Sequence, residues 1–184
     1  MDKDSLALLY SAIAAWGTWA TVLCALVVVW SQNRSSKRIA CLQLFVQLSA
    51  QYDSSDMRGI RRRLADKLLS DLKSVEVEDS LPLYFENLAI LSRRRLLDRD
   101  LMWNTFVFDV PRYWHVLKHY VEFCRKKFAN PAIYEEFQLL ATQLSSQTRS
   151  PLGTELPPLD LSEDDIREFL RYESRIGGQR SDDP

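Results

Sequence analysis

The stretch SLALLYSAIAAWGTWATVLCALVVVWSQN, residues 5–33, decides the fold class because it contains no charged side chain. Within it, Leu6 to Trp30 gives 25 mostly apolar residues. A helix rises about 1.5 Å per residue, so this length covers the ~30 Å hydrocarbon core of a bilayer. Tyr10 and Trp30 would place one aromatic ring near each interface. The sequence therefore predicts a transmembrane helix spanning about residues 6–30, within an N-terminal segment 1–33.

The charges that flank this segment predict its orientation. Lys3 is the only basic side chain before the span, whereas Arg34, Lys37 and Arg38 follow it directly. Basic residues favour the cytoplasmic side, so we expect the N-terminus outside and the rest of the chain in the cytoplasm. A cleavable signal peptide is the alternative, but the start lacks a basic region and the end lacks a small-residue cleavage site.

Small residues follow one side of the predicted span at alternating intervals of four and three. This spacing allows two membrane helices to approach closely, so it predicts a homo-oligomer through the transmembrane helix. Small residues are common throughout the span, and chance spacing is the alternative. The residues of this small-residue stripe are Ala7, Ser11, Ala14, Thr18, Thr21 and Ala25.

The remainder of the chain predicts an all-α protein. No Gly or Pro lies between the span and Asp53, so the first helix is expected to continue to about residue 52. Apolar residues recur at helical intervals through residues 34–145, and no segment shows sustained strand alternation. We therefore expect a cytosolic helical domain at 34–145, built as a bundle of about five or six helices.

Caps and prolines divide this domain into helices. The expected starts are Ser54 and its neighbours, Ser80 with Pro82, Asp98 or Asp100, Pro111, and Asn130 with Pro131. The helix that begins near Ser80 has two apolar faces, one containing Phe85 and another containing Leu83 and Ile90. A helix covered on both sides is expected at the centre of the bundle.

A linker and a short helix follow the domain. Residues 146–160 are rich in Pro and lack apolar periodicity, which predicts a flexible linker. Residues 161–184 predict an acidic amphipathic helix and a disordered tail. The helix presents Ile166, Phe169 and Leu170 as an apolar stripe that docks either on its own domain or in a partner's groove. In the partner version, deletion of residues 151–184 leaves the body folded.

The formal net charge of −1 hides a division along the chain. Residues 34–127 carry a net charge of +6 and residues 128–184 a net charge of −6. A basic body suits anionic lipids or an acidic protein partner, and nucleic acid is not expected because no recognition motif accompanies the charges. The candidate contact residues are two triplets, Arg61, Arg62 and Arg63, and Arg93, Arg94 and Arg95.

The two triplets also have structural interpretations. Arg61 projects onto the edge of an apolar helical face. This position indicates that the aliphatic part of its side chain packs on the core, and we then expect an acidic partner for its guanidinium inside the domain. The triplet that begins at Arg93 ends a predicted helix, where basic side chains suit the negative end of the helix dipole.

A metal site has one candidate. His115, His119 and Glu122 share one side of a predicted helix, although apolar residues opposite them make this the solvated face. We expect no cofactor, because the chain has only five glycines and no phosphate-binding loop, and no nucleophile with a recognisable base. Three widely spaced cysteines predict neither a disulfide framework nor a zinc site.

Four short stretches carry a resemblance to a known family. They are FENL at 85–88, LDRDL at 97–101, YW at 113–114 and YEEF at 134–137. The region from about residue 35 to 145 resembles a bacterial family of small uncharacterised helical proteins, a domain of unknown function usually preceded by one membrane helix. The resemblance implies location in the cell inner membrane and no enzyme activity, and it supplies no catalytic residue.

These observations predict a non-enzymatic, single-pass membrane-anchored interaction protein. It would act as a sensor, scaffold or regulator that presents a basic helical domain to a cytosolic protein partner. One alternative is a membrane-perturbing effector of a toxin or defence type that acts by oligomerisation. A metal-dependent enzyme that uses His115, His119 and Glu122 is the other.

Overall fold

The computed structural model describes residues 3–147, 150, 153–155 and 161–176, without the side chains of residues 3–24 and Arg38. The described part contains seven α-helices and no strand, which confirms the all-α class. Contacts divide the chain into two compact units, residues 1–43 and 44–184. Most of the expected linker 146–160 and the tail after Ile176 lie outside the described residues.

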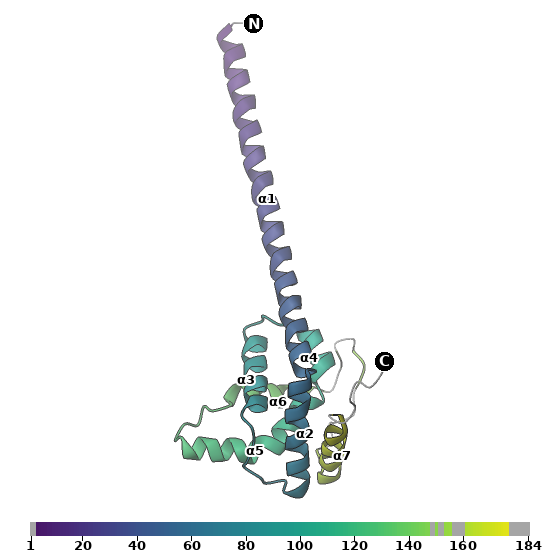
Figure 1. The fold of residues 1–184 in the computed structure, drawn as a ribbon. Helices are drawn as coiled ribbons and strands as arrows, with labels where there is room; N and C mark the ends of the chain where they lie inside the picture. The colour runs from purple at the N-terminus through teal and green to yellow at the C-terminus, as the bar shows by residue number, and fades with distance from the viewer. Residues whose placement is uncertain (1–2, 148–149, 151–152, 156–160, 177–184) are drawn as a thin grey trace. The chain divides into compact units, whose positions relative to one another are not determined.

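The first helix, α1, runs without interruption over Lys3–Tyr52 (Figure 1). Its continuation to residue 52 is therefore confirmed. In the described part of the chain, no helix is long and apolar enough to span a membrane. The side chains of the expected span up to Cys24, and with them the small-residue stripe up to Thr21, lie outside the described residues.

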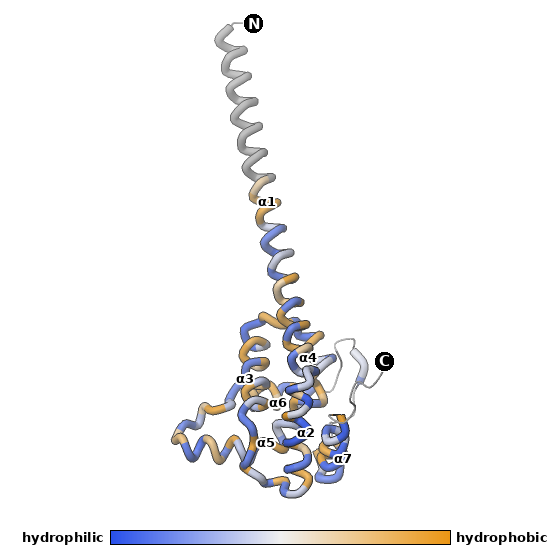
Figure 2. The backbone as a smooth tube through the Cα atoms, in the orientation of Figure 1, coloured by the Kyte–Doolittle hydropathy of each residue, from blue (hydrophilic) through white to orange (hydrophobic). Residues whose placement is uncertain are grey.

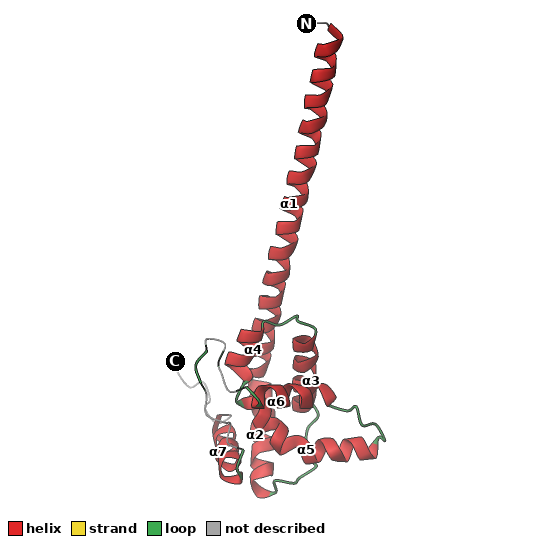
Figure 3. Ribbon diagram, turned by 180° about the vertical axis from the view of Figure 1, so that it is seen from behind, coloured by secondary structure: helices red, strands yellow, loops and turns green. Residues whose placement is uncertain are grey.

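The second unit packs the end of α1 with six further helices (Figures 1 and 3). Both views show α7 beside α2, and α3 and α6 also pack against each other. Hydrophobic and hydrophilic positions alternate along these helices, and α7 is mostly hydrophilic (Figure 2). The helices are α2 (Ser55–Ser70), α3 (Ser80–Arg93), α4 (Arg99–Phe106), α5 (Asp109–Lys127), α6 (Glu135–Ser145) and α7 (Glu163–Ile176).

Two expected helix caps are present, and a third cap precedes α7. The Ser54 hydroxyl accepts from the Met57 amide at 3.2 Å at the start of α2. Asp98 caps α4 by accepting from two backbone amides. The Ser162 hydroxyl accepts from the Asp165 amide at 3.3 Å before α7. Short polar side chains at these positions satisfy amides that have no partner inside the helix.

The expected helix start at Asn130 and Pro131 is wrong. The Asn130 side chain accepts from the Ala132 amide at 3.0 Å, and this bond closes a turn instead of capping a helix. Tyr134 then adopts a left-handed conformation with φ of 56°, and α6 begins only at Glu135. The local hydrogen bond of Asn130 therefore competes successfully with helix capping.

The core confirms one apolar face of α3 and corrects the other. Leu81, Phe85 and Leu88 are completely buried, but Leu83 is 51% exposed. Tyr84 lies on the same side of the helix as Leu81 and Leu88, three and four residues away, and its ring stacks on Tyr52 at a centroid distance of 5.6 Å. Leu83 lies on the opposite side and faces solvent.

Candidate functional site

The C-terminal helix α7 packs on the body of its own chain. It lies along α2 and also contacts α5. Its stripe residues Ile166, Phe169 and Leu170 are buried and belong to the main hydrophobic core. The ring of Phe169 meets that of Tyr113 edge-on, with centroids 5.0 Å apart. Of the two alternatives that the sequence left open, the structure has docking on the chain's own domain.

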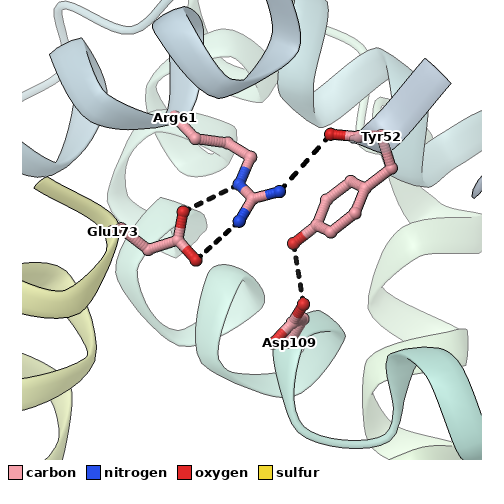
Figure 4. Close-up of polar contacts among 4 residues, drawn as sticks. All are labelled: Tyr52, Arg61, Asp109 and Glu173. Carbon is pink, nitrogen blue, oxygen red and sulfur yellow. Dashed lines mark hydrogen bonds and ion pairs between the residues drawn. The ribbon is translucent and has the colours of Figure 1, made fainter. Parts of the chain in front are cut away.

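A buried ion pair joins α7 to α2 (Figure 4). Arg61 Nε donates to Glu173 Oε2 at 2.7 Å, and Nη2 donates to Oε1 at 2.9 Å. The residues are 4% and 2% exposed, so the two-bond pair is withdrawn from water. The acidic partner expected for Arg61 is present, and it comes from a helix 112 residues farther along the chain.

Two more residues complete this buried cluster. The guanidinium of Arg61 lies 4.1 Å from the centre of the Tyr52 ring, close enough for a cation–π interaction. The Tyr52 hydroxyl donates to Asp109 Oδ2 at 2.8 Å (Figure 4). The four residues come from the end of α1, α2, the start of α5 and α7. We call Tyr52, Arg61, Asp109 and Glu173 the buried cluster.

Burial dominates the electrostatics of this cluster. For Arg61 burial acts to lower the pKa, but the hydrogen bond to Glu173 and the nearby phenols and carboxylate raise it overall. Burial raises the pKa of Asp109, and the Tyr52 hydrogen bond offsets this only in part. Arg61 is therefore a permanent cation whose charge is balanced by Glu173 of α7.

The phenol of Tyr113 lies next to this cluster without joining it. Its hydroxyl is buried close to Glu173, and the described residues give it no hydrogen bond of good geometry. Burial raises its pKa well above the ordinary value, and the charge of Glu173 raises it further. Tyr113 is therefore neutral and acts here through its ring, which faces Phe169.

Two further polar contacts hold α7 at its ends. Arg112 forms a two-bond pair with Asp165, with both N–O distances at 3.0 Å. The Ser174 hydroxyl donates to Asp66 Oδ1 at 2.6 Å. Two carboxylates of α7, Asp165 and Glu173, thus each engage an arginine fork of the body, the geometry that gives charge-assisted hydrogen bonds their specificity.

The other arginines of the two triplets are exposed. Arg62 lies 3.9 Å from Asp66, and Arg63 forms a two-bond pair with Glu78. Arg93 pairs with Glu136 at 2.7 Å. Arg94 and Arg95 follow at the end of α3, with Arg95 at a positive φ of 56°. The structure therefore separates Arg61, which is buried, from the surface arginines.

The metal candidate does not form a site in the structure. His115 and His119 are half-buried on α5 and Glu122 is exposed. Among the described residues, no group of three or more His, Cys, Asp or Glu side chains is arranged to hold a metal ion. Burial lowers the pKa of His115, and the neighbouring charge of Lys118 lowers it further.

A groove of about 570 Å³ lies between the α2–α3 connection and the second half of α5. The hydroxyls of Tyr120 and Tyr134 both donate to Asp79 there. Lys67 and Lys127 also line it. Because Asp79 and Lys127 are exposed, the groove is open to water and lacks the buried charges of the cluster under α7.

A comparison with protein families identifies the family of this chain. The model of a domain of unknown function, DUF4760, matches residues 7–144. The chain belongs to the DUF4760 family. No curated protein and no solved structure matches it. The resemblance to an uncharacterised family is thereby confirmed, and the match includes the apolar residues that precede the second unit.

The DUF4760 match ends before α7. Arg61, Arg112 and Tyr113 lie inside the matched region, whereas Asp165 and Glu173 lie beyond it. The surface of α2 and α5 that α7 covers, which we call the α7 groove and which is distinct from the groove near Asp79, is therefore part of the DUF4760 region. The helix that fills it is attached outside that region.

The sequence predicted an acidic partner for Arg61 but identified neither Glu173 nor the other members of the buried cluster. Glu173 carries a usable signal, because it follows Ile166, Phe169 and Leu170 at helical spacing and so lies on the apolar stripe. A charged residue in a buried stripe requires a partner of opposite charge. Tyr52, Asp109 and Arg112 carry no comparable signal, because their roles depend on how distant helices meet.

Proposed function

We propose that this DUF4760 protein is a non-enzymatic, single-pass membrane-anchored interaction protein in which α7 regulates access to a groove on the cytoplasmic domain. The observation that carries the proposal is the docking of α7 on α2 through the buried pair of Arg61 and Glu173. A helix attached beyond the DUF4760 region occupies this groove as an intramolecular ligand would.

The anchor rests on residues 6–30, which are apolar and are followed by basic residues. The DUF4760 match begins at residue 7, so most of this segment belongs to the family region. We place the protein in a bacterial inner membrane with the N-terminus outside. The lipid bilayer and a cytosolic protein are its proposed partners.

The chemistry of the buried cluster is suited to binding α7 and not to catalysis. Arg61 stays protonated, and both carboxylate oxygens of Glu173 are engaged by its guanidinium. Neither side chain reaches solvent, so a substrate would have to displace α7 before it met either group. A general base needs a free oxygen or nitrogen within reach of the reacting proton, and this pair offers none.

Tethering explains why a docked helix can regulate binding. A helix joined to its binding site within the same chain experiences an effective concentration of up to the mM range. A partner that uses the same groove must overcome this competition, so binding depends on its concentration and on the strength of the Arg61–Glu173 pair. Weakening that pair should favour the partner.

A covalent lock tests the proposal directly. Asp66 and Ser174 are in side-chain contact at 2.6 Å across α2 and α7, so in the Asp66→Cys/Ser174→Cys variant the two thiols are neighbours. Oxidation joins them directly or, where the Cβ atoms lie beyond about 4.5 Å, through a short reducible thiol-specific cross-linker. The background replaces the native cysteines Cys24, Cys41 and Cys124. The oxidised and reduced forms of the variant are each cross-linked in membranes, and the partner proteins captured by the two forms are compared. The Asp66→Cys single variant is the control.

We expect the reduced form to cross-link a protein that the oxidised form does not. The Glu173→Gln variant should increase that product. Identical cross-linked products from the oxidised and reduced forms would show that α7 does not control access.

Self-association of the membrane helix is a separate part of the proposal. The small-residue stripe supports it and also underlies the alternative of a membrane-perturbing effector. Replacing Ala14 and Thr18 with Leu should abolish cross-linked oligomers in membranes. Oligomers that persist after this change would contradict both self-association through the small-residue stripe and the membrane-perturbing effector.

A further inference from the structure

The groove under α7 contacts a defined set of side chains on the helix it holds. At one end Arg112 binds Asp165 through two hydrogen bonds, and at the other Arg61 binds Glu173 in the same way. The two acidic residues are eight positions apart, which is about 12 Å along a helix. Two arginine side chains held at this separation therefore select a helix by its negative charge and by the spacing of its acidic residues.

Apolar contacts fill the interval between the two forks. Ile166, Phe169 and Leu170 enter the core of the body, and Tyr113 supplies the ring against which Phe169 packs. These positions follow Asp165 by one, four and five residues. An amphipathic helix in a groove is normally recognised through anchors with this spacing.

The outward side of α7 contributes little to this recognition. Tyr172 is 64% exposed, and Asp164 and Glu168 are exposed acidic residues on the same helix. The body therefore distinguishes Asp165 and Glu173 from acidic neighbours of identical charge. This difference provides matched controls within one short segment.

We infer that the groove recognises, on a protein partner, an acidic amphipathic helix with the pattern of α7: an acidic residue, apolar residues one, four and five positions later, and a second acidic residue eight positions later. This inference rests on the proposed function and names its class of partner. The groove lies within the DUF4760 region, and α7 occupies it from outside that region.

Charge complementarity selects this class of partner. A helix with a neutral residue at the second acidic position leaves Arg61 buried without its hydrogen-bonded counter-charge, and a basic residue there adds repulsion. Removing one partner of a buried ion pair is strongly unfavourable. Anionic lipid headgroups and nucleic-acid phosphates lack the apolar anchors that fill the space between the two forks.

The test uses the whole chain with one cut. A protease site inserted between Gly153 and Thr154 allows the connection to be cleaved while α7 stays bound, which converts α7 from a tethered into a dissociable ligand. A fluorescent peptide of residues 161–176 is then added, and its exchange into the cleaved protein is followed by anisotropy. The protein carries no substitution in the groove, so folding is not at issue.

Unlabelled peptides then compete with the fluorescent one. We expect the Glu173→Gln peptide to bind about 100-fold or more weakly than the wild-type peptide, and the Asp165→Asn peptide about 10-fold more weakly. The Glu168→Gln and Asp164→Asn peptides should bind within about 2-fold of the wild type, because they remove the same charge from exposed positions.

Two results would overturn the inference. One is a failure of the labelled peptide to exchange into the cleaved protein, which would make α7 an inseparable part of the core. The other is equal competition by the Glu173→Gln and Glu168→Gln peptides, which would leave the groove without charge recognition. In that second case α7 would still exchange, and control of access by α7 would stand on the locking experiment alone.

Discussion

At the scale of single residues, Arg61 and Glu173 decide how α7 is held. A buried ion pair adds little net stability, because the loss of hydration offsets the attraction, yet loss of one partner is costly. The pair therefore specifies which helix fills the groove more than it stabilises the fold. The cation–π contact with Tyr52 and the bond from Tyr52 to Asp109 fix the arginine in one position.

The first prediction concerns Glu173→Gln. We expect it to lower the free energy of unfolding by about 3–5 kcal/mol, because Arg61 keeps its charge but loses its hydrogen-bonded counter-charge. Release of α7, which rehydrates Arg61, sets the upper limit of the loss. The measurement is urea unfolding, with the exposed Glu168→Gln as the control. A loss no larger than that of the control would mean that the pair is dispensable.

The second prediction concerns pH and Asp109. Burial raises its pKa in the folded protein above that of the unfolded chain, so the folded state holds the proton more tightly. The resulting stability is complete below the unfolded pKa, near 4, and is lost as pH rises through the folded pKa. Wild type should therefore gain stability relative to Asp109→Asn as pH falls through this window. Parallel stability curves for the two proteins would contradict the prediction.

The residue scale also shows where sequence reasoning stops. Arg61 was predicted to need an acidic partner because it interrupts an apolar face, and that is confirmed. The identity of the partner was not predictable from spacing, because 112 residues separate the two. Only the packing of α7 on α2 brings them together.

At the scale of elements, α7 is a core helix by its burial, although it is a separate segment by its place in the chain. Its stripe residues are as buried as those of α3, although its connection to α6 contains the segment predicted as a linker. The expectation that residues 151–184 can be removed without effect on the body therefore needs revision. Their loss would expose the apolar groove and leave Arg61 without its partner.

The third prediction tests this role within α7 itself. Phe169→Ala should lower the free energy of unfolding by about 3–5 kcal/mol, since it removes a buried ring and leaves a cavity. Tyr172→Ala, three residues away and 64% exposed, is the matched control and should change it by less than about 0.5 kcal/mol. Thermal or urea unfolding measures both. Equal effects would show that α7 is not part of the core.

Helix boundaries were predicted well where a capping side chain acts alone and poorly where it has another use. Ser54 and Asp98 cap α2 and α4 as expected. Asn130 instead closes a turn, and the chain needs the left-handed residue Tyr134 before α6 can start. Both outcomes use the same side-chain oxygen, so the sequence did not distinguish them.

At the scale of the whole molecule, helical periodicity and the absence of strand alternation were sufficient to predict the all-α class. The family comparison confirms an uncharacterised domain over residues 7–144. The contents of the groove were not predictable, because they depend on a helix that returns to the domain from beyond it.

The fourth prediction concerns membrane topology. With a span at residues 6–30 and the N-terminus outside, a membrane-impermeant maleimide should label Ser5→Cys in intact cells. The native Cys41 should react only after the membrane is opened. Labelling of Cys41 in intact cells, or of neither position after permeabilisation, would contradict the orientation or the anchor.

Hydrogen exchange of backbone amides tests the central claim most directly, by comparing the full-length wild type with Glu173→Gln. If α7 is a ligand held by Arg61, its amides should exchange through an opening that leaves α3 and α6 folded. In both proteins α7 should then exchange faster than the buried amides of α3 and α6, and Glu173→Gln should accelerate exchange in α7 by about 100-fold. Equal protection of α7, α3 and α6 in both proteins would contradict it, because α7 would then open only when the whole domain unfolds.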